Sequence, residues 1–103
     1  PAWMEFVLSH NVMRFAQMAV RIWGIQMNFE NPEDTALKGI REFRKFLSSI
    51  GMPVNFDQLD AKEEDIPLLV EKFGIGDNKT GGFVSLNSAD IAQILEIAAK
   101  ATV

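Results

Sequence analysis

Residues 11–24, NVMRFAQMAVRIWG, hold the clearest amphipathic pattern in the chain. Apolar side chains recur along one face at the spacing of a helix: Val12, Phe15, Ala16, Ala19, Val20 and Trp23. The opposite face carries Arg14, Gln17 and Arg21. Gly24 follows, and glycine is the residue that most often ends a helix. The pattern predicts a helix from about Asn11 to Trp23 with one buried face.

The ten residues before this segment are apolar on almost every side. Trp3, Phe6, Val7 and His10 share one helical face, and Pro1 suits a first helical turn. The spacing predicts a helix over residues 1–10 that is buried on more than one side.

A third helix is expected to begin near Asn31, because Asn31-Pro32-Glu33-Asp34 combines a cap residue, a first-turn proline and two carboxylates. Gly51 and Pro53 end it. Its buried stripe is predicted to be Ala36, Ile40, Phe43, Leu47 and Ile50. Its cationic side chains, expected on a solvated face, are Lys38, Arg41, Arg44 and Lys45.

After a single turn over Asn55–Leu59, the pair Asp60 and Glu63 has the spacing of a capping box and predicts another helix. Pro67 either kinks this helix or makes it restart with Asp65 as a second cap. The inner face is predicted to be Ile66, Leu69, Val70 and Phe73.

Residues 74–82 contain four glycines and indicate a loop. Asn87 and Asp90 then form a second capping-box pair, Leu86 can pack against Ile91, and a last helix runs to about Lys100. The residues expected to face inward are Ile91, Ile94, Leu95 and Ala98. Since no long run alternates with a period of two, the predicted fold is all-α, an irregular bundle of about five helices. Residues 1–103 form a single helical domain or a fragment of a larger one.

Composition excludes several classes of function. Ten Lys and Arg against fourteen Asp and Glu give a net charge of -4, so nucleic acid is not an expected partner. No cysteine is present, which rules out disulfides and thiolate chemistry and fits a reducing cytoplasm. No apolar run approaches the roughly 20 residues that span a bilayer, so neither a membrane span nor a signal peptide is predicted.

The sequence predicts no catalytic, cofactor-binding or metal-binding residue within the chain. His10 is the only histidine, and no second histidine shares its helix face. Ser9 adjoins His10, but neighbouring helical residues point in different directions. The acids Glu63, Glu64 and Asp65 are typical of a helix start. The glycine-rich loop lacks the glycine that a phosphate-binding loop has before Lys79.

Short pieces of the chain nevertheless occur in the order found in the iron-containing alcohol dehydrogenases. The first pieces are Pro1-Ala2-Trp3-Met4-Glu5-Phe6, Arg14-Phe15-Ala16-Gln17 and Val20-Arg21-Ile22-Trp23-Gly24. Later pieces are Ala36-Leu37, Gly39-Ile40, Ser49-Ile50-Gly51 with Pro53, Glu64-Asp65-Ile66-Pro67, Thr80-Gly81-Gly82 and Asp90-Ile91 with Ile94. Together they resemble this family, its butanol dehydrogenase branch in particular, over nearly the whole chain.

The resemblance implies a larger enzyme that oxidises alcohols or reduces aldehydes with NAD(P) and a divalent metal, iron or zinc. In that family an aspartate and three histidines hold the metal, and all of them match positions upstream of Pro1, as does the nucleotide-binding domain. The chain would be the distal part of the dehydroquinate synthase-like helical domain. Its expected role is architectural, without catalysis by the chain alone.

Two further expectations follow from the resemblance. The loop Thr80-Gly81-Gly82 matches the first half of a Thr-Gly-Gly-Asn-Pro-Arg loop that approaches the substrate cleft in relatives, while Phe83 and the two residues after it depart from that pattern. We therefore consider Thr80, Gly81, Gly82 and Phe83 as a candidate cleft-lining loop.

The expected partner of the chain is the upstream part of its own parent. The start at Pro1, directly in an apolar helix pattern, suggests a cut inside a longer protein. Uncovered apolar helix faces could also pair two copies of the chain. The alternative hypothesis is an independent helical module that binds a partner protein.

Overall fold

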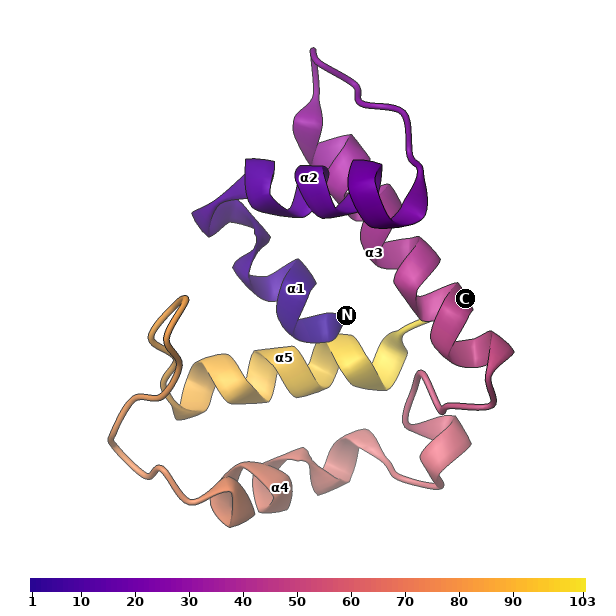
Figure 1. Ribbon diagram of the computed structural model, residues 1–103. Coiled ribbons are helices and arrows are strands. Elements are labelled where there is room, and N and C mark those ends of the chain that lie inside the picture. Colours follow the sequence, from indigo (N-terminus) through magenta and orange to yellow (C-terminus); the bar gives the residue numbers. More distant parts are fainter.

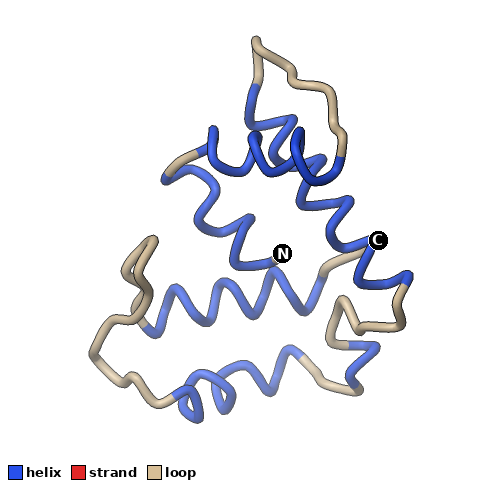
Figure 2. The backbone as a smooth tube through the Cα atoms, viewed as in Figure 1, coloured by secondary structure: helices blue, strands red, loops and turns tan.

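Five α-helices and three short 3₁₀ turns make up the computed structural model, which describes all residues 1–103. The helices are α1 (Ala2–Val7), α2 (Val12–Trp23), α3 (Pro32–Ser49), α4 (Ile66–Phe73) and α5 (Ser88–Lys100). Figure 1 shows α2 packed across α3, and α5 lying between α1 and α4. No strand is present, as Figure 2 makes plain, so the all-α prediction is confirmed.

The first predicted helix is shorter than expected. α1 ends at Val7, and a tighter 3₁₀ turn covers Leu8–His10. The buried residues are Val7 and Leu8, whereas Trp3 is 39% exposed and His10 is also exposed. The prediction of a helix buried on more than one side is therefore wrong at Trp3, and the tighter turn takes His10 out of line with the earlier residues.

Helices α2 and α3 form the densest contact in the molecule. Phe15, Ala16 and Ala19 of α2 are buried, but Val20 of the predicted face is 37% exposed. The helix ends at Gly24, as predicted, and Gly24 adopts a left-handed conformation. A Cβ atom added to Gly39 of α3 would lie 2.4 Å from the Cβ of Ala19. Two small residues at the crossing thus let the helix backbones approach closely. The predicted stripe of α3 is buried at Ala36 and Ile40 but fails at Ile50, which is 58% exposed.

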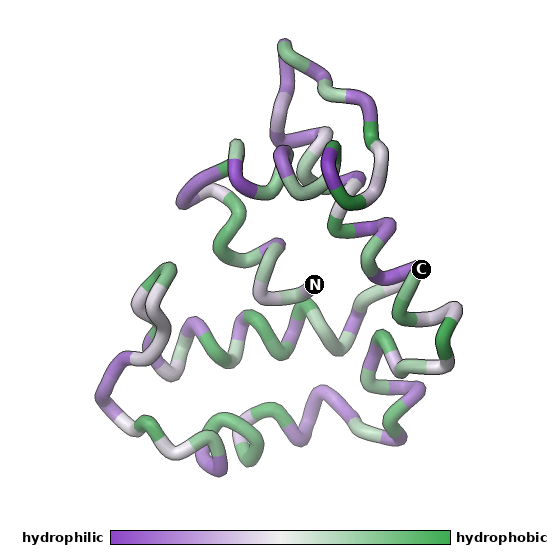
Figure 3. Tube along the Cα trace, in the orientation of Figure 1, coloured by the Kyte–Doolittle hydropathy of each residue, from purple (hydrophilic) through white to green (hydrophobic).

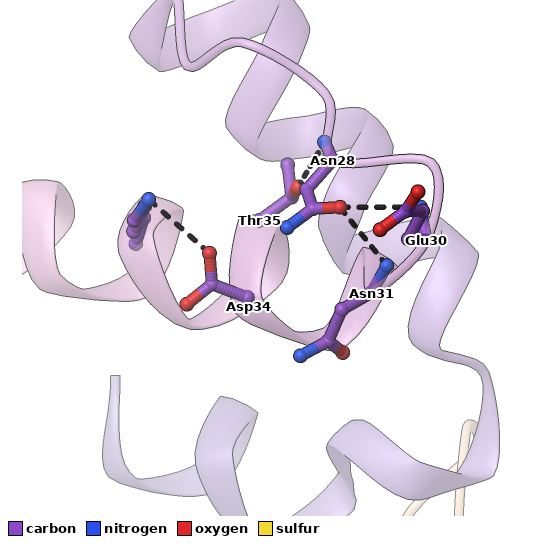
Figure 4. Close-up of polar contacts among 6 residues, drawn as sticks. Asn28, Glu30, Asn31, Asp34 and Thr35 are labelled. Carbon is purple, nitrogen blue, oxygen red and sulfur yellow. Dashed lines mark hydrogen bonds and ion pairs between the residues drawn. The ribbon is translucent and has the colours of Figure 1, made fainter.

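The turn that leads into α3 is held by a residue that the sequence did not single out (Figure 4). Asn31 occupies the cap position, but its side chain makes no cap hydrogen bond. Instead the Oδ1 atom of Asn28 accepts hydrogen bonds from the N–H groups of Glu30 and Asn31, each at 3.1 Å. The fully buried Thr35 hydroxyl in turn accepts from the Asn28 N–H at 2.8 Å. Asn28 therefore fixes the loop before α3, whereas the first turn of the helix itself has no side-chain cap.

The predicted capping box of Asp60 and Glu63 is wrong. Asp60 adopts a left-handed conformation after the 3₁₀ turn Asp57–Leu59, so it cannot open a helix. The Oδ2 atom of Asp65 accepts from the Lys62 N–H at 2.9 Å, and α4 restarts at Ile66 with Pro67 in its first turn. Of the two alternatives for Pro67, the structure adopts the restart.

Helix α4 buries much less of its apolar surface than predicted. Ile66 is its only buried residue, while Leu69 is 38% and Phe73 54% exposed. In Figure 3, apolar colouring continues along much of α4, although most of its side chains are uncovered. Of the predicted inner face, Leu69 and Phe73 lie outside any core because α5 is the only α-helix that packs extensively against this helix.

The last helix begins as predicted. Asn87 Oδ1 accepts from the Asp90 N–H at 2.8 Å, and Asp90 Oδ2 accepts from the Asn87 N–H at 3.0 Å. Leu86 is buried, and Ile91 packs against the apolar cluster that contains it. None of the five helices has both the length and the apolar character needed to cross a bilayer.

Candidate functional site

The candidate loop Thr80–Phe83 is held at its base by two backbone hydrogen bonds. The Thr80 N–H donates to the Leu86 carbonyl at 2.9 Å, and the Leu86 N–H donates to the Thr80 carbonyl at 2.7 Å. Gly81 has a φ of 107°, and a Cβ added there would meet the Val84 carbonyl oxygen at 2.4 Å. This turn therefore requires glycine at position 81. Gly82 has open space around it.

Phe83 folds back from the loop onto the junction of α1 and α2. Its ring meets three others edge to face, with centroid distances of 5.8 Å to Trp3, 4.9 Å to His10 and 5.9 Å to Phe15. Such edge contacts each contribute about 0.5–1.5 kcal/mol beyond the buried area. Phe83 is still 36% exposed, so the four rings present a partly open aromatic surface beside the loop.

The remaining residues considered from the sequence do not assemble into a catalytic or metal site. Nowhere do three or more His, Cys, Asp or Glu side chains gather in a way that could hold a metal ion. His10 lies against Phe83, and Glu63, Glu64 and Asp65 are exposed at a helix start. The residues of this chain therefore do not fit the metal that the resemblance assigns to the parent.

Arg44 is the polar residue whose position the sequence analysis missed. It was expected on a solvated face, yet only 7% of it is exposed. Its Nη1 atom donates to the Oε1 atom of Glu5, which joins α3 to α1. Its spacing is the signal that could have revealed it, because Arg44 continues the i, i+4 series of the buried Ala36 and Ile40. A buried cation needs an anion, and Glu5 is the one acid in the apolar run of α1.

The second terminal nitrogen of Arg44, Nη2, is buried without any hydrogen-bond partner. A cavity of about 200 Å³ adjoins Arg44 and is lined by the start of α1, the end of α3, residues 53–59 and the end of α5. Burial lowers the pKa of the Pro1 amine at the edge of this cavity, and the Arg44 charge lowers it further, while Glu5 opposes the change. The region thus disfavours an added positive charge.

Comparison with known proteins settles the family. Residues 1–99 match the model of the C-terminal part of the Fe-containing alcohol dehydrogenase family. The chain belongs to that family. It is 32% identical over 96 residues to a probable NADH-dependent butanol dehydrogenase 1 of Bacillus subtilis, covering 93% of this chain but 24% of that protein. It is also 26% identical over 98 residues to NADH-dependent butanol dehydrogenase A of Clostridium acetobutylicum, covering 93% and 25% of the two chains.

A solved structure agrees with the family assignment. NADH-dependent butanol dehydrogenase A from Thermotoga maritima superposes with a TM-score of 0.83 at 31% identity, over 97% of this chain and 26% of that chain. The recognition of the iron-containing alcohol dehydrogenases from short motifs is therefore confirmed. The chain spans about a quarter of the length of these relatives.

Proposed function

We propose that this chain is the C-terminal helical segment of a larger NAD(P)-dependent alcohol dehydrogenase, in which it contributes structure rather than catalytic groups. The observation that carries the proposal is the match of nearly the whole chain to only 26% of a butanol dehydrogenase. In the parent, a divalent metal, iron or zinc, would polarise the alcohol or aldehyde oxygen for hydride exchange with the nicotinamide. The metal ligands and the nucleotide site would lie outside these residues.

Within that parent, we assign the loop Thr80–Phe83 to the wall of the substrate cleft. The rigid base of the loop and the partly exposed ring of Phe83 support the assignment. Phe83 departs from the Asn-Pro-Arg continuation that the resemblance predicts, so this wall would be apolar where relatives present polar groups. An apolar wall favours an aliphatic or aromatic substrate chain.

The uncovered apolar side chains of α4 fit the same proposal. Leu68, Leu69 and Phe73 are 51%, 38% and 54% exposed, which is unusual for side chains of one short helix. Contact with the rest of the parent would cover them. An independent protein-binding module would use the same face, and a start codon directly before Pro1 in the source gene would favour that alternative.

The first test compares the 103-residue chain with the full-length parent. Each is purified, dialysed against iron and zinc, analysed for metal, and assayed for NADH and NADPH oxidation with butyraldehyde. The proposal expects metal and turnover in the parent and neither in the short chain. A parent without metal and turnover would refute it, as would stoichiometric metal in the short chain.

The loop assignment is tested in the parent by Phe83→Ala, with Phe73→Ala as the matched control. If Phe83 lines the cleft, its truncation raises the KM for butyraldehyde by about 10-fold, the effect of about 1.4 kcal/mol of lost apolar contact, with the metal content unchanged. Phe73 lies on α4, and its truncation leaves the KM within about twofold. Equal KM values in both variants would remove Phe83 from the cleft.

A further inference from the structure

The guanidinium of Arg44 lies beside the first turn of α1, and only one of its two terminal nitrogens has a hydrogen-bond partner. Nη1 pairs with Glu5, one turn after Pro1, whereas Nη2 is buried and has no acceptor. A buried donor on a charged group that lacks an acceptor is costly, and folded proteins rarely tolerate one. The geometry therefore calls for an additional acceptor at this point.

The cavity of about 200 Å³ next to Arg44 is also lined by Pro1 and Ala2 at the start of α1. A more polar hollow on another side of Arg44 is lined by Arg41 and Lys100, whose positive charges already surround it. The other walls of the cavity are mainly apolar, including Leu47, Phe56 and Ala98. The lowered pKa of the Pro1 amine shows that this place disfavours a second cation beside Arg44. A neutral group that offers an oxygen acceptor and carries apolar atoms matches these walls best.

A peptide unit meets this description, and Pro1 is the point from which one would extend. We propose that the backbone leading into Pro1 in the longer protein occupies this cavity, where one of its carbonyl oxygens accepts a hydrogen bond from Arg44 Nη2. This inference rests on the proposed function, since it requires a parent that continues upstream. Arg44 then acts as a positioning residue that joins three segments: α3, α1 through Glu5, and the backbone before Pro1.

The arrangement gives Arg44 a role that lysine cannot fill. An ammonium group could still pair with Glu5, but it lacks the planar fork that reaches a carboxylate and a carbonyl in two fixed directions. Arg41, one turn earlier on the same helix, is exposed and forms no ion pair within the chain. It therefore provides a matched control for the loss of one arginine from α3.

The test measures amide hydrogen exchange by mass spectrometry in the full-length parent, in the peptides that precede Pro1 and cover α1. Arg44→Met and Arg44→Lys are both expected to speed exchange there by about tenfold, the effect of one lost charge-assisted hydrogen bond. Arg41→Met should leave these peptides unchanged. The inference fails if Arg44→Lys and Arg41→Met give the same exchange rates. Arg44→Lys keeps the test decisive should Arg44→Met not fold.

A second variant probes the cavity from the opposite wall. Ala98→Leu would fill the space, so in the 103-residue chain it should leave the melting temperature unchanged or raise it. In the parent, where the upstream backbone occupies the cavity, the same variant should lower the melting temperature by about 1–4 °C. Shifts of the same sign in both proteins would overturn the inference. None of these readouts needs turnover, so an inactive parent with these shifts would refute only the proposed function.

Discussion

The α2–α3 pair and helix α4 show how differently two amphipathic patterns can be used in one chain. In the pair, Ala16, Ala19, Ala36 and Ile40 are completely buried, and Gly39 lets the backbones nearly touch. On α4 only Ile66 is buried, although its sequence is more apolar overall. Amphipathic spacing thus predicts a helix, but the partner that covers its apolar face has to come from elsewhere in the protein.

The largest expected contrast between the two regions comes from truncating one aliphatic side chain in each. Ile40→Ala removes a fully buried side chain and should lower the free energy of unfolding by about 2–5 kcal/mol. Leu68→Ala, on α4 at 51% exposure, should change it by less than about 0.5 kcal/mol. Urea denaturation of the 103-residue chain measures both. Similar losses would mean that α4 belongs to the same core.

The close approach of α2 and α3 predicts that Gly39→Ala destabilises the chain by about 1–3 kcal/mol, because the new Cβ would overlap that of Ala19. The intrinsic helix preference of alanine works in the opposite direction by about 1 kcal/mol. Gly82→Ala is the control, since nothing lies within 4 Å of its added Cβ. Thermal unfolding followed by circular dichroism separates the two, and a stabilising Gly39→Ala would contradict the close crossing.

The helix starts offer a smaller contrast between two asparagines at cap positions. Asn87→Ala removes a real side-chain cap from α5 and should cost about 1 kcal/mol. Asn31→Ala should cost only a few tenths, because the Asn31 side chain makes no cap hydrogen bond. Asn28→Ala, which removes an acceptor shared by two N–H groups, should behave like Asn87→Ala. Denaturation midpoints of the three variants test this order.

The smallest effect is expected at the exposed end of α4. Phe73→Ser should alter the free energy of unfolding of the 103-residue chain by less than about 0.5 kcal/mol, because the ring is 54% exposed. In the full-length parent the same substitution should cost more, about 1–2 kcal/mol, if the proposed contact covers the ring. Equal values in the two proteins would show that α4 remains uncovered in the parent.

The sequence predicted the helices well at most places where the signal was local, with the Asp60–Glu63 pair as the exception. The buried part of the α2 stripe, the helix end at Gly24 and the Asn87–Asp90 capping box all involve residues within a few positions of one another, and these were found as expected, although Val20 of the stripe is exposed. The candidate loop was likewise predicted as part of a glycine-rich loop, although its place in a substrate cleft stays a prediction. These features could be read from the chain because neighbouring residues alone create them.

Most of the misplaced features depend on contacts beyond neighbouring residues. Arg44 is buried and pairs with Glu5, 39 positions away, across α1 and α3. The side chain of Asn31 caps nothing, and Asn28 holds the loop before α3, which folds back on Thr35. Phe83 meets Trp3, His10 and Phe15 only once the loop returns to the first two helices.

The sequence by itself therefore determined the all-α class, most helix limits and the family. Helix propensity, capping and short motifs act over a few residues, so they are present in the chain before it folds. Only the tertiary structure decided which helix faces are buried. It also decided that the Arg44 guanidinium is desolvated and that its Nη2 atom lacks a hydrogen-bond acceptor. Burial and pairing depend on which segments meet in space, and a linear pattern does not specify that meeting.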